Sequence, residues 1–256
     1  MPDFVVDSAA WIRRFHPAPD AGTRLVCFPH AGGSASFYHP VSAALAPGIE
    51  VLTVQYPGRQ DRRAEQPITD IGELADGVFA ALRPWLDGGP PSGGDRKVAL
   101  FGHSMGAIVA FEVARRMERE FRAPSLLVAS GRRAPSRYRQ EAVHRRDDAG
   151  IIAEITRLSG TDPRLLDETE MLRAALPAIR GDYQAVETYV SDPGAALACP
   201  VTVFVGDDDP MVTLEEANAW RGHTTAGFDL HVFKGGHFYL TSQPAATIER
   251  LAELCF

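Results

Sequence analysis

Short apolar runs rich in β-branched residues alternate along this chain with longer amphipathic segments. Runs of four to eight such residues are typical of buried strands, and apolar residues every three or four positions are typical of helices that cover a sheet. The pattern predicts six strands, at residues 24–28, 49–55, 97–101, 125–130, 201–205 and 228–233. It predicts helices at residues 36–46, 71–86, 107–120, 214–221 and 245–254. Because strands and helices alternate, we expect an α/β fold with a mainly parallel central sheet and helices on both faces.

The alternation breaks at about residues 132–198, where no run resembles a strand. This stretch begins polar and arginine-rich and continues with helical patterns at residues 149–158 and 165–190. We expect a helical lid insertion over the strand ends, within a single domain that spans residues 1–256. The alternative is a pair of surface helices that only extend the fold.

Composition and charge exclude a few classes of protein. The 256 residues are enough for one domain with a large core, and the net charge of −7 disfavours wholesale nucleic-acid binding. No apolar stretch approaches the roughly 20 residues of a membrane span, and the N-terminus lacks a secretory signal pattern. We therefore expect no membrane association and a cytoplasmic location. Three widely spaced cysteines without CxxC spacing argue against a disulfide framework and a zinc site.

The pentapeptide Gly102-His103-Ser104-Met105-Gly106 is the most informative motif. It follows a predicted strand and precedes a predicted helix, which is the setting of a nucleophile elbow. At such a turn the serine adopts a strained backbone conformation. The glycines two residues to either side leave room where a Cβ would collide with neighbouring backbone. Ser104 is therefore the candidate nucleophile.

A serine hydroxyl needs a base to accept its proton and an acid to orient that base. In this topology the acid and the histidine follow the serine in that order. His237 comes directly after the last predicted strand and a glycine pair, as a base reaching over Ser104 requires. We predict His237 as the base, with His30 as the alternative.

Three consecutive aspartates follow the strand predicted at 201–205. We predict Asp209 as the acid, because the glycine before the three permits the turn and Pro210 fixes the chain just beyond it. Asp207 and Asp208 are then expected to be solvated or to bond N–H groups of the turn. A calcium or magnesium site is the competing interpretation, but the spacing of the aspartates is not that of a calcium loop, so we expect no metal.

A glycine-rich segment at residues 28–33, FPHAGG, follows the first predicted strand. Glycines let backbone approach a ligand closely, and the loop after this strand is where the second oxyanion N–H is expected. We predict that the N–H groups of Ala31 and Met105 form the oxyanion hole. The alternative is a loop that only turns the chain.

With these segments in order, the sequence resembles the α/β-hydrolase thioesterases, and specifically the stand-alone type II (editing) thioesterases of polyketide and nonribosomal peptide pathways. The motifs that carry the resemblance are FPHAGG at 28–33, QYPGRQDR at 55–62, GHSMG at 102–106, GDDDP at 206–210 and GGHF at 235–238. GHSMG alone would fit many esterases, whereas the combination is more specific. The resemblance covers nearly the whole chain. It implies nucleophile, base, acid and oxyanion donors at the same positions: Ser104, His237, Asp209, Ala31 and Met105.

The resemblance implies hydrolysis of acyl groups from the phosphopantetheine arm of acyl or peptidyl carrier proteins, which clears aberrant or stalled chains from a polyketide or nonribosomal peptide synthase. It implies no bound cofactor, because the phosphopantetheine belongs to the substrate, and we expect a monomer. The rivals are a general carboxylesterase or lipase-like hydrolase and a non-catalytic hydrolase-fold binding protein. A thioesterase domain cut from a synthase is a further rival, and the initial methionine leads us to expect a stand-alone chain instead.

Carrier proteins are usually acidic, so the resemblance implies a basic docking surface. The candidates are one cluster of Arg59, Arg62 and Arg63 and a second of Arg132, Arg133, Arg137 and Arg139. The planar fork of arginine suits phosphate and carboxylate groups. We expect charge reversal at Arg132 and Arg133 to raise KM for a carrier-bound substrate but not for a small thioester.

Overall fold

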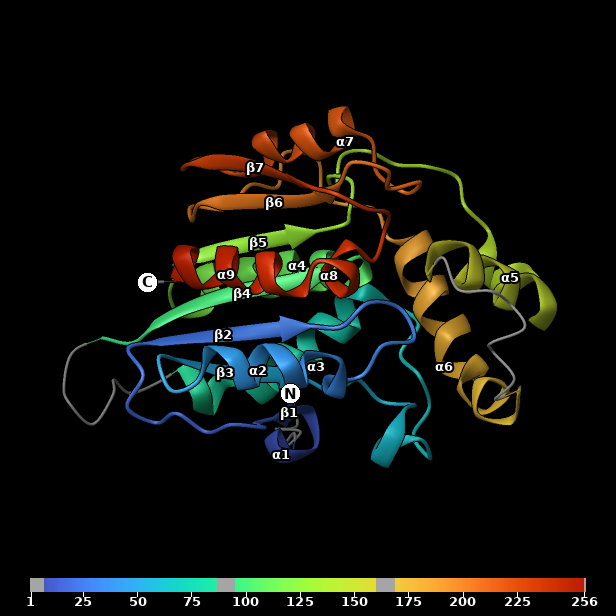
Figure 1. Ribbon diagram of the computed structural model, residues 1–256, viewed down its shortest axis with the longest axis horizontal. Helices are drawn as coiled ribbons and strands as arrows, with labels where there is room; N and C mark the ends of the chain where they lie inside the picture. The colour runs from blue at the N-terminus through green and yellow to red at the C-terminus, as the bar shows by residue number, and fades with distance from the viewer. Residues whose placement is uncertain (1–6, 87–94, 160–168, 256) are drawn as a thin grey trace.

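The computed structural model describes residues 7–86, 95–159 and 169–255, and their strands form one twisted sheet (Figure 1). The strands are β1 (Ile12–Arg13), β2 (Thr23–Phe28), β3 (Ile49–Val54), β4 (Lys97–His103), β5 (Leu126–Ser130), β6 (Val201–Gly206) and β7 (Phe228–Phe233). Their order across the sheet is β1-β3-β2-β4-β5-β6-β7. All neighbours from β3 to β7 are parallel, so the predicted mainly parallel sheet is confirmed.

The six predicted strands are all present, with ends that differ from the prediction by at most two residues. Strand β1 was not predicted, because its two residues are too short to show any alternation. It pairs antiparallel with β3, placing Ile12 opposite Val54, and so covers part of what would be an open sheet edge.

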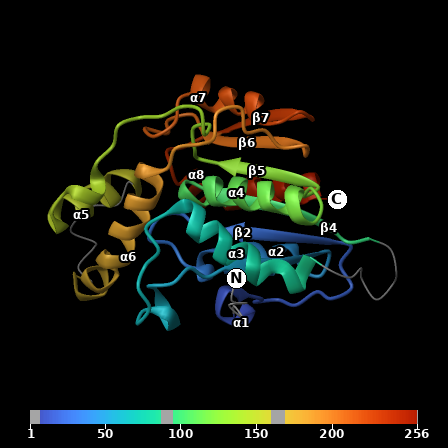
Figure 2. The ribbon, with the colours of Figure 1, turned by 180° about the vertical axis from the view of Figure 1, so that it is seen from behind.

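Helices cover both faces of the sheet, as predicted. Helices α2 (His39–Leu45) and α9 (Pro244–Cys255) lie on the face toward the viewer in Figure 1. Helices α3 (Ile71–Leu86) and α4 (Met105–Glu120) lie on the opposite face, which is in front in Figure 2. The shorter helices are α1 (Ser8–Trp11), α7 (Leu214–Asn218) and α8 (Tyr239–Ser242). Short 3₁₀ turns replace α-helix at the start of the predicted helix 36–46 and at the end of the predicted helix 214–221.

The alternation of apolar side chains along the strands divides the core into two layers. In β2, Val26 and Phe28 pack into the layer beneath α3 and α4, while Leu25 and Cys27 pack into the layer beneath α2 and α9. Both pairs are fully buried. A strand that is covered on both faces favours apolar residues at most positions, which explains why strands β2 to β6 read as largely apolar runs, whereas β7 is partly exposed.

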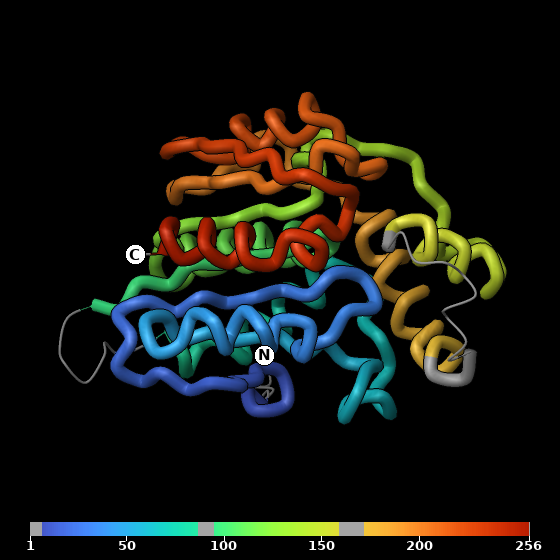
Figure 3. The backbone as a smooth tube through the Cα atoms, viewed as in Figure 1, coloured from blue at the N-terminus to red at the C-terminus, as the bar shows by residue number. Residues whose placement is uncertain are grey.

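The stretch between β5 and β6 leaves the sheet at the carboxyl ends of the strands and returns to it, as the tube in Figure 3 shows. It contains α5 (Asp148–Ser159) and α6 (Thr169–Thr188), and residues 165–168 of the predicted second helix lie outside the described residues. Ile179 of α6 packs on the loop after β2, where a Cβ on Gly32 would come within 2.7 Å of its side chain. The expected placement of helices over the strand ends is therefore confirmed. We call residues 132–198 the insertion.

The opposite end of the sheet is held by a buried ion-pair network. Glu50, at the start of β3, is fully buried and pairs with Arg14, Arg24 and Arg96. These groups lie at the amino ends of the parallel strands, away from the insertion. Among the helices of the described residues, none is long and apolar enough to cross a bilayer.

Candidate active site

Ser104 occupies the sharp turn between β4 and α4. Its backbone angles, φ 53° and ψ −119°, lie in a region that L-residues rarely adopt. Its N–H donates to the carbonyl of Ser130 at 2.8 Å, which ties the turn to the end of the neighbouring strand β5. The side chain sits at the N-terminus of a 16-residue helix, where backbone N–H groups have no helical acceptor. This is the strained elbow that the motif predicts.

The two glycines of the motif are required by close backbone packing. A Cβ on Gly102 would lie 2.1 Å from the carbonyl oxygen of Gly106. A Cβ on Gly106 would lie 2.1 Å from the carbonyl oxygen of Phe28, at the end of β2. Both distances are far below contact, so neither position accepts a side chain without moving backbone. The glycines thus let the turn sit tightly between two strand ends.

His237 and Asp209 form a buried hydrogen-bonded pair. His237 Nδ1 lies 3.1 and 3.0 Å from the two carboxylate oxygens of Asp209, and the two side chains are 2% and 0% exposed. The Met211 N–H also donates to Asp209, at 2.8 Å, which fixes the carboxylate. Because a carboxylate only accepts, Nδ1 carries the proton and Nε2 is left free as the basic nitrogen.

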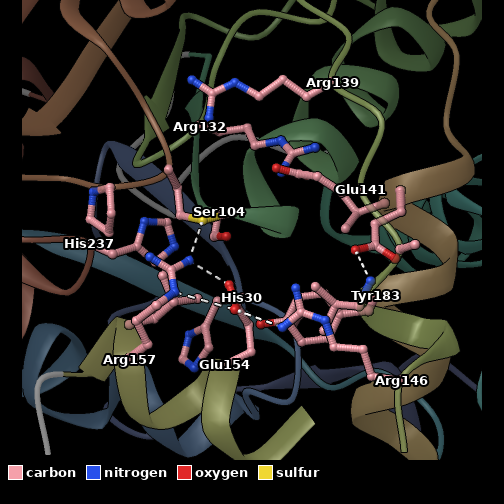
Figure 4. Close-up of a pocket in the computed structure, with 18 of the residues that line it drawn as sticks. His30, Ser104, Arg132, Arg139, Glu141, Arg146, Glu154, Arg157, Tyr183 and His237 are labelled. Atoms are coloured by element: carbon pink, nitrogen blue, oxygen red, sulfur yellow. Dashed lines mark hydrogen bonds and ion pairs between the residues drawn. The ribbon is translucent and has the colours of Figure 1, made fainter. Parts of the chain in front are cut away.

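A cavity of about 450 Å³ brings these groups together. Ser104, His237, Ala31 and His30 all line it, and Figure 4 shows the serine and both histidines at its wall. The residues come from the turns after β2, β4 and β7, all of which end at the same sheet edge. No hydrogen bond joins Ser104 to His237 among the described residues, and such a contact often tightens only when substrate binds.

His30, the alternative base, is hydrogen-bonded to no carboxylate within the residues that the structure describes. Its Nδ1 is buried and has no hydrogen-bond partner among the described residues. Burial, assisted by the charges of His237 and Arg59, lowers the pKa of His30 to about 3. A base with so low a pKa accepts a proton poorly near neutral pH. The geometry therefore favours His237.

His103 lies behind His237 and supports it. Its ring is fully buried, with its centroid 5.0 Å from that of His237. His103 Nδ1 is 2.8 Å from the Ser130 hydroxyl, which is 2.5 Å from the hydroxyl of Tyr239. Burial, and next the charges of His237 and His30, hold the pKa of His103 well below its ordinary value. Nothing in the sequence pattern pointed to Ser130 or Tyr239 as parts of this support.

The predicted oxyanion donors lie on either side of the elbow. Met105 is the first residue of α4 and is fully buried, and Ala31 lies in the loop after β2 and lines the cavity. Within the described part of the chain, neither N–H has an acceptor. Ala31 lines the cavity, and Met105 directly follows the cavity-lining Ser104. Two free donors so close to a serine hydroxyl can stabilise an oxyanion.

The loop that carries Ala31 is fixed by a carboxylate from the insertion. Asp182 of α6 accepts the Gly32 N–H at 2.7 Å and pairs through both oxygens with Arg59, at 2.7 and 2.8 Å. The side chains of Asp182 and Arg59 are only 2% and 6% exposed. Asp182 is not among the site residues predicted from the sequence, although a signal is present there. It is a charged residue in the buried stripe of α6, between the apolar Ile179 and Val186.

The first arginine cluster is not a docking surface. Arg59 is buried in the pair just described, and Arg62 is 6% exposed, bonded to Glu65 and to the carbonyl of Gln55. Carboxylates of the protein already pair with both of these guanidinium groups, and of the cluster only Arg63 is exposed. The prediction failed because periodicity does not show which arginines turn inward.

The second arginine cluster is only partly available as a docking surface, because Arg137 is exposed whereas Arg132 and Arg133 are buried. Arg132 and Arg133 are 8% and 4% exposed, and Arg133 pairs with Glu141. Arg139 is bonded to Glu216 through two nitrogens. Charge reversal at Arg132 and Arg133 would therefore place carboxylates in the interior, and the expected selective effect on carrier-bound substrate no longer follows.

The three aspartates of the turn after β6 differ in their surroundings. Asp207 accepts the Gly235 N–H at 2.9 Å, as predicted for a residue that bonds the turn, and Asp208 is exposed. Over the described residues, no group of three or more His, Cys, Asp or Glu side chains could hold a metal ion.

The chain has close relatives among known proteins. A family model described as "Thioesterase domain" matches residues 23–255. The chain is 55% identical over 246 residues to "Probable cadicidin biosynthesis thioesterase" of Streptomyces griseus, covering 96% of this chain and 66% of that protein. It is 53% identical over 239 residues to "Thioesterase PikA5" of Streptomyces venezuelae, covering 93% of this chain and 83% of that protein. The chain thus spans just under two thirds of the first relative.

Solved structures show the same likeness. The structure described as "the type II thioesterase BorB from the borrelidin biosynthetic cluster" matches with a TM-score of 0.84 and 50% identity, covering 96% of each chain. "RedJ-Thioesterase from the Prodiginine biosynthetic pathway in Streptomyces coelicolor" matches with a TM-score of 0.84 and 35% identity, covering 93% of this chain and 87% of that one.

Proposed function

This chain belongs to the thioesterase family, and from that premise we propose that it is a type II thioesterase that hydrolyses acyl thioesters on the phosphopantetheine arm of carrier proteins. The observation that carries the proposal is the buried His237–Asp209 pair, which shares a cavity with the strained Ser104 at a helix N-terminus. Base, acid and nucleophile are the parts that serine acyl transfer needs.

In the proposed mechanism, His237 Nε2 takes the proton of the Ser104 hydroxyl as its oxygen attacks the thioester carbonyl carbon. The carbonyl oxygen becomes an oxyanion that accepts from the N–H groups of Ala31 and Met105. The C–S bond then breaks, and the departing sulfur takes the proton from His237. A thiol with a pKa of about 8.5 is a good leaving group. The enzyme therefore mainly has to form the serine alkoxide and stabilise the oxyanion.

Water completes the cycle. His237 takes one proton from a water molecule, and the hydroxide oxygen attacks the acyl carbon of the Ser104 ester. Collapse of the second oxyanion breaks the ester bond, returns the proton to Ser104 and releases the free acid. Asp209 holds the imidazole and stabilises its charged form throughout.

A second cavity, of about 440 Å³, adjoins the first and shares five lining residues with it: His30, Ala31, Leu158, Tyr183 and Phe238. Its wall is mainly apolar. The apolar side chains are Phe37, Ile155, Leu158, Leu172, Ala175 and Ile179. We assign this cavity to the alkyl part of the acyl group, because apolar surface removed from water favours binding.

The proposed partners are acyl or peptidyl carrier proteins of a polyketide or nonribosomal peptide synthase. Support comes from the relatives, whose names refer to cadicidin biosynthesis and the borrelidin biosynthetic cluster. The cofactor-free reaction, the monomeric state and the cytoplasmic location stay predictions.

The test compares three substrates with one acyl group: propanoyl on a phosphopantetheinylated acyl carrier protein, the N-acetylcysteamine thioester and ethyl propanoate. We expect turnover of both thioesters, with the higher kcat/KM on the carrier protein. Ser104→Ala should lower both rates by about a thousandfold or more.

Preferential cleavage of the ethyl ester would instead indicate a general carboxylesterase. No turnover of any of the three by the folded wild type would indicate a non-catalytic binding protein. A Ser104→Ala variant with unchanged activity would remove Ser104 from the mechanism. Circular dichroism of each variant controls for folding.

A further inference from the structure

Arg132 is a buried cation in the wall of the cavity that contains Ser104. The residue is 8% exposed, and its Nε has no hydrogen-bond partner among the described residues. Its guanidinium also forms no ion pair within that part of the chain. Figure 4 shows Arg132 and Ser104 at the same cavity. An unpaired buried charge is costly to folding, so its retention here calls for a compensating ligand.

The other charged groups of this wall already have partners. The pairs are Arg139 with Glu216, Arg146 and Arg157 with Glu154, Glu141 with Arg133, and Glu187 with His144. Glu187 also accepts the N–H groups of Val143 and His144. Glu141 and Glu187 act on Arg132 electrostatically, but Arg133 and Arg139 oppose them. Among the described arginines of this wall, Arg132 is therefore the one without an ion-pair partner.

The two residues just before Arg132 in the chain lie next to Ser104 and His237. Ser130, two residues earlier, accepts the Ser104 N–H at 2.8 Å. A Cβ on Gly131 would lie 3.4 Å from Cε1 of His237. Two residues span at most roughly 7 Å, so Arg132 begins close to the point where the acyl carbon must sit.

The charge of Arg132 persists at working pH. Burial, together with the neighbouring charge of Arg133, lowers the pKa of Arg132 to about 10, which leaves the guanidinium protonated near neutrality. Its planar fork matches a carboxylate through two parallel hydrogen bonds. The complementary ligand is thus an oxyanion held within a few bonds of the reacting carbonyl.

We propose that Arg132 binds a carboxylate carried by the acyl group, so that the substrate class includes thioesters of dicarboxylic acids. This inference rests on the proposed function and names a substrate for the same site. A phosphate is the other oxyanion a substrate could offer. The phosphate of phosphopantetheine lies at the far end of the arm from the sulfur, whereas Arg132 begins beside the elbow, and this favours the acyl carboxylate.

The test measures kcat/KM for matched N-acetylcysteamine thioesters: malonyl against propanoyl, and succinyl against butanoyl. The quantity compared is the ratio of the carboxylate-bearing to the neutral thioester within each pair. Arg132→Gln should lower at least one ratio by about tenfold to a hundredfold, since a hydrogen-bonded charge pair is lost. Arg132→Lys should keep part of the ratio. Arg139→Gln, at a paired arginine of the same wall, should leave both ratios unchanged.

Unchanged ratios in Arg132→Gln would overturn the proposal. Arg132→Gln could instead lower kcat/KM equally for both acyl groups of a pair on the carrier protein and leave the small thioesters unaffected. That result would also overturn the proposal and would show that Arg132 binds the phosphate. If Arg132→Gln does not fold, product inhibition of the wild type decides: succinate should inhibit at least about tenfold more strongly than butanoate, and equal inhibition contradicts the proposal. Hydrolysis of the neutral thioesters, lost in Ser104→Ala, tests the proposed function separately.

Discussion

Single residues at the elbow combine backbone strain with close packing. Ser104 has φ 53°, and Gly102 and Gly106 face carbonyl oxygens that a Cβ would approach to 2.1 Å. Such strain persists only where the surroundings determine it, here through the bond from Ser104 N–H to Ser130. The result is that the Ser104 hydroxyl, the proposed nucleophile, lies at the start of a helix, beside N–H groups that have no acceptor within the described part of the chain.

His103, which precedes the proposed nucleophile Ser104, illustrates how a buried histidine affects the response of stability to pH. Its buried ring keeps its pKa well below the ordinary value in the folded protein, chiefly through burial. In the unfolded chain the same group titrates near about 6.5. Below that pH the unfolded state binds a proton that the folded state does not, so the free energy of unfolding falls as pH falls.

We predict that His103→Gln weakens this acid sensitivity. Below pH 6.5, the free energy of unfolding of the wild type should fall by up to about 1.4 kcal/mol more per pH unit than that of the variant, because the variant lacks one titrating group. Urea unfolding at pH 7, 6 and 5 measures the difference. Parallel stability curves for the two proteins would show that His103 takes up its proton in the folded state.

Among the structural elements, α6 of the insertion directly contacts the loop that carries Ala31, a proposed oxyanion donor. It contributes Asp182, whose carboxylate links the Gly32 N–H to the Arg59 guanidinium in a buried cluster. Ile179, one turn earlier, packs against the same glycine. The helix therefore sets the position of the loop that carries Ala31. It also explains why Arg59, within the YPGR segment, lies inside the protein.

We predict that Asp182 is a positioning residue for this loop. Asp182→Ala should lower kcat by about tenfold or more with a smaller change in KM, because a displaced Ala31 N–H weakens stabilisation of the oxyanion. Asp182→Asn keeps an acceptor for Gly32 and should recover part of kcat. Steady-state kinetics on the propanoyl thioester measures both.

The same variants separate positioning from stability. Either substitution leaves Arg59 buried without its counter-charge, so both should lower the free energy of unfolding, by about 3–5 kcal/mol. If both variants are destabilised but keep wild-type kcat when folded, Asp182 has only a structural role.

Across the whole molecule, the two ends of the parallel sheet have different tasks. The carboxyl ends carry the turns with Ser104, Asp209 and His237, and the insertion covers them (Figure 1). The amino ends carry the buried Glu50 with its arginine partners, of which Arg24 makes a 2.7 Å bond. Burial opposes its ionisation, but hydrogen bonds and charges of Arg24 and Arg14 hold the pKa of Glu50 below its ordinary value.

We predict that Glu50→Gln destabilises the protein without impairing catalysis. The free energy of unfolding should fall by about 3–5 kcal/mol, because buried arginines lose their common partner. The value of kcat should equal that of the wild type at temperatures where both are folded. Glu253→Gln, which removes an exposed ion pair with Arg250, is the matched control and should cost less than about 1 kcal/mol. A loss of kcat in folded Glu50→Gln would show coupling between the two ends.

Much of this architecture could be read from the sequence. Strands β2 to β6 are buried on both faces and appear as largely apolar runs, and the partly exposed β7 is apolar at four of its six positions, so all six were found to within two residues. The elbow was also readable, because the motif, its strand and its helix are contiguous. The two-residue β1 was missed because it has no period to detect, and Asp182 because a single charge in an apolar stripe does not reveal its partner.

The sequence by itself determined the α/β alternation, the elbow and the order of serine, acid and histidine, because each depends on neighbouring residues or on chain order. Only the tertiary structure decided which charges are buried and with whom they pair. Asp182 meets Gly32 across 150 positions, and Arg59 lies 123 positions from Asp182. The arginines at 132 and 133 read as surface charge in the sequence and lie inside the fold. Whether a charge is buried depends on long-range packing, which the local periodicity of a sequence does not show.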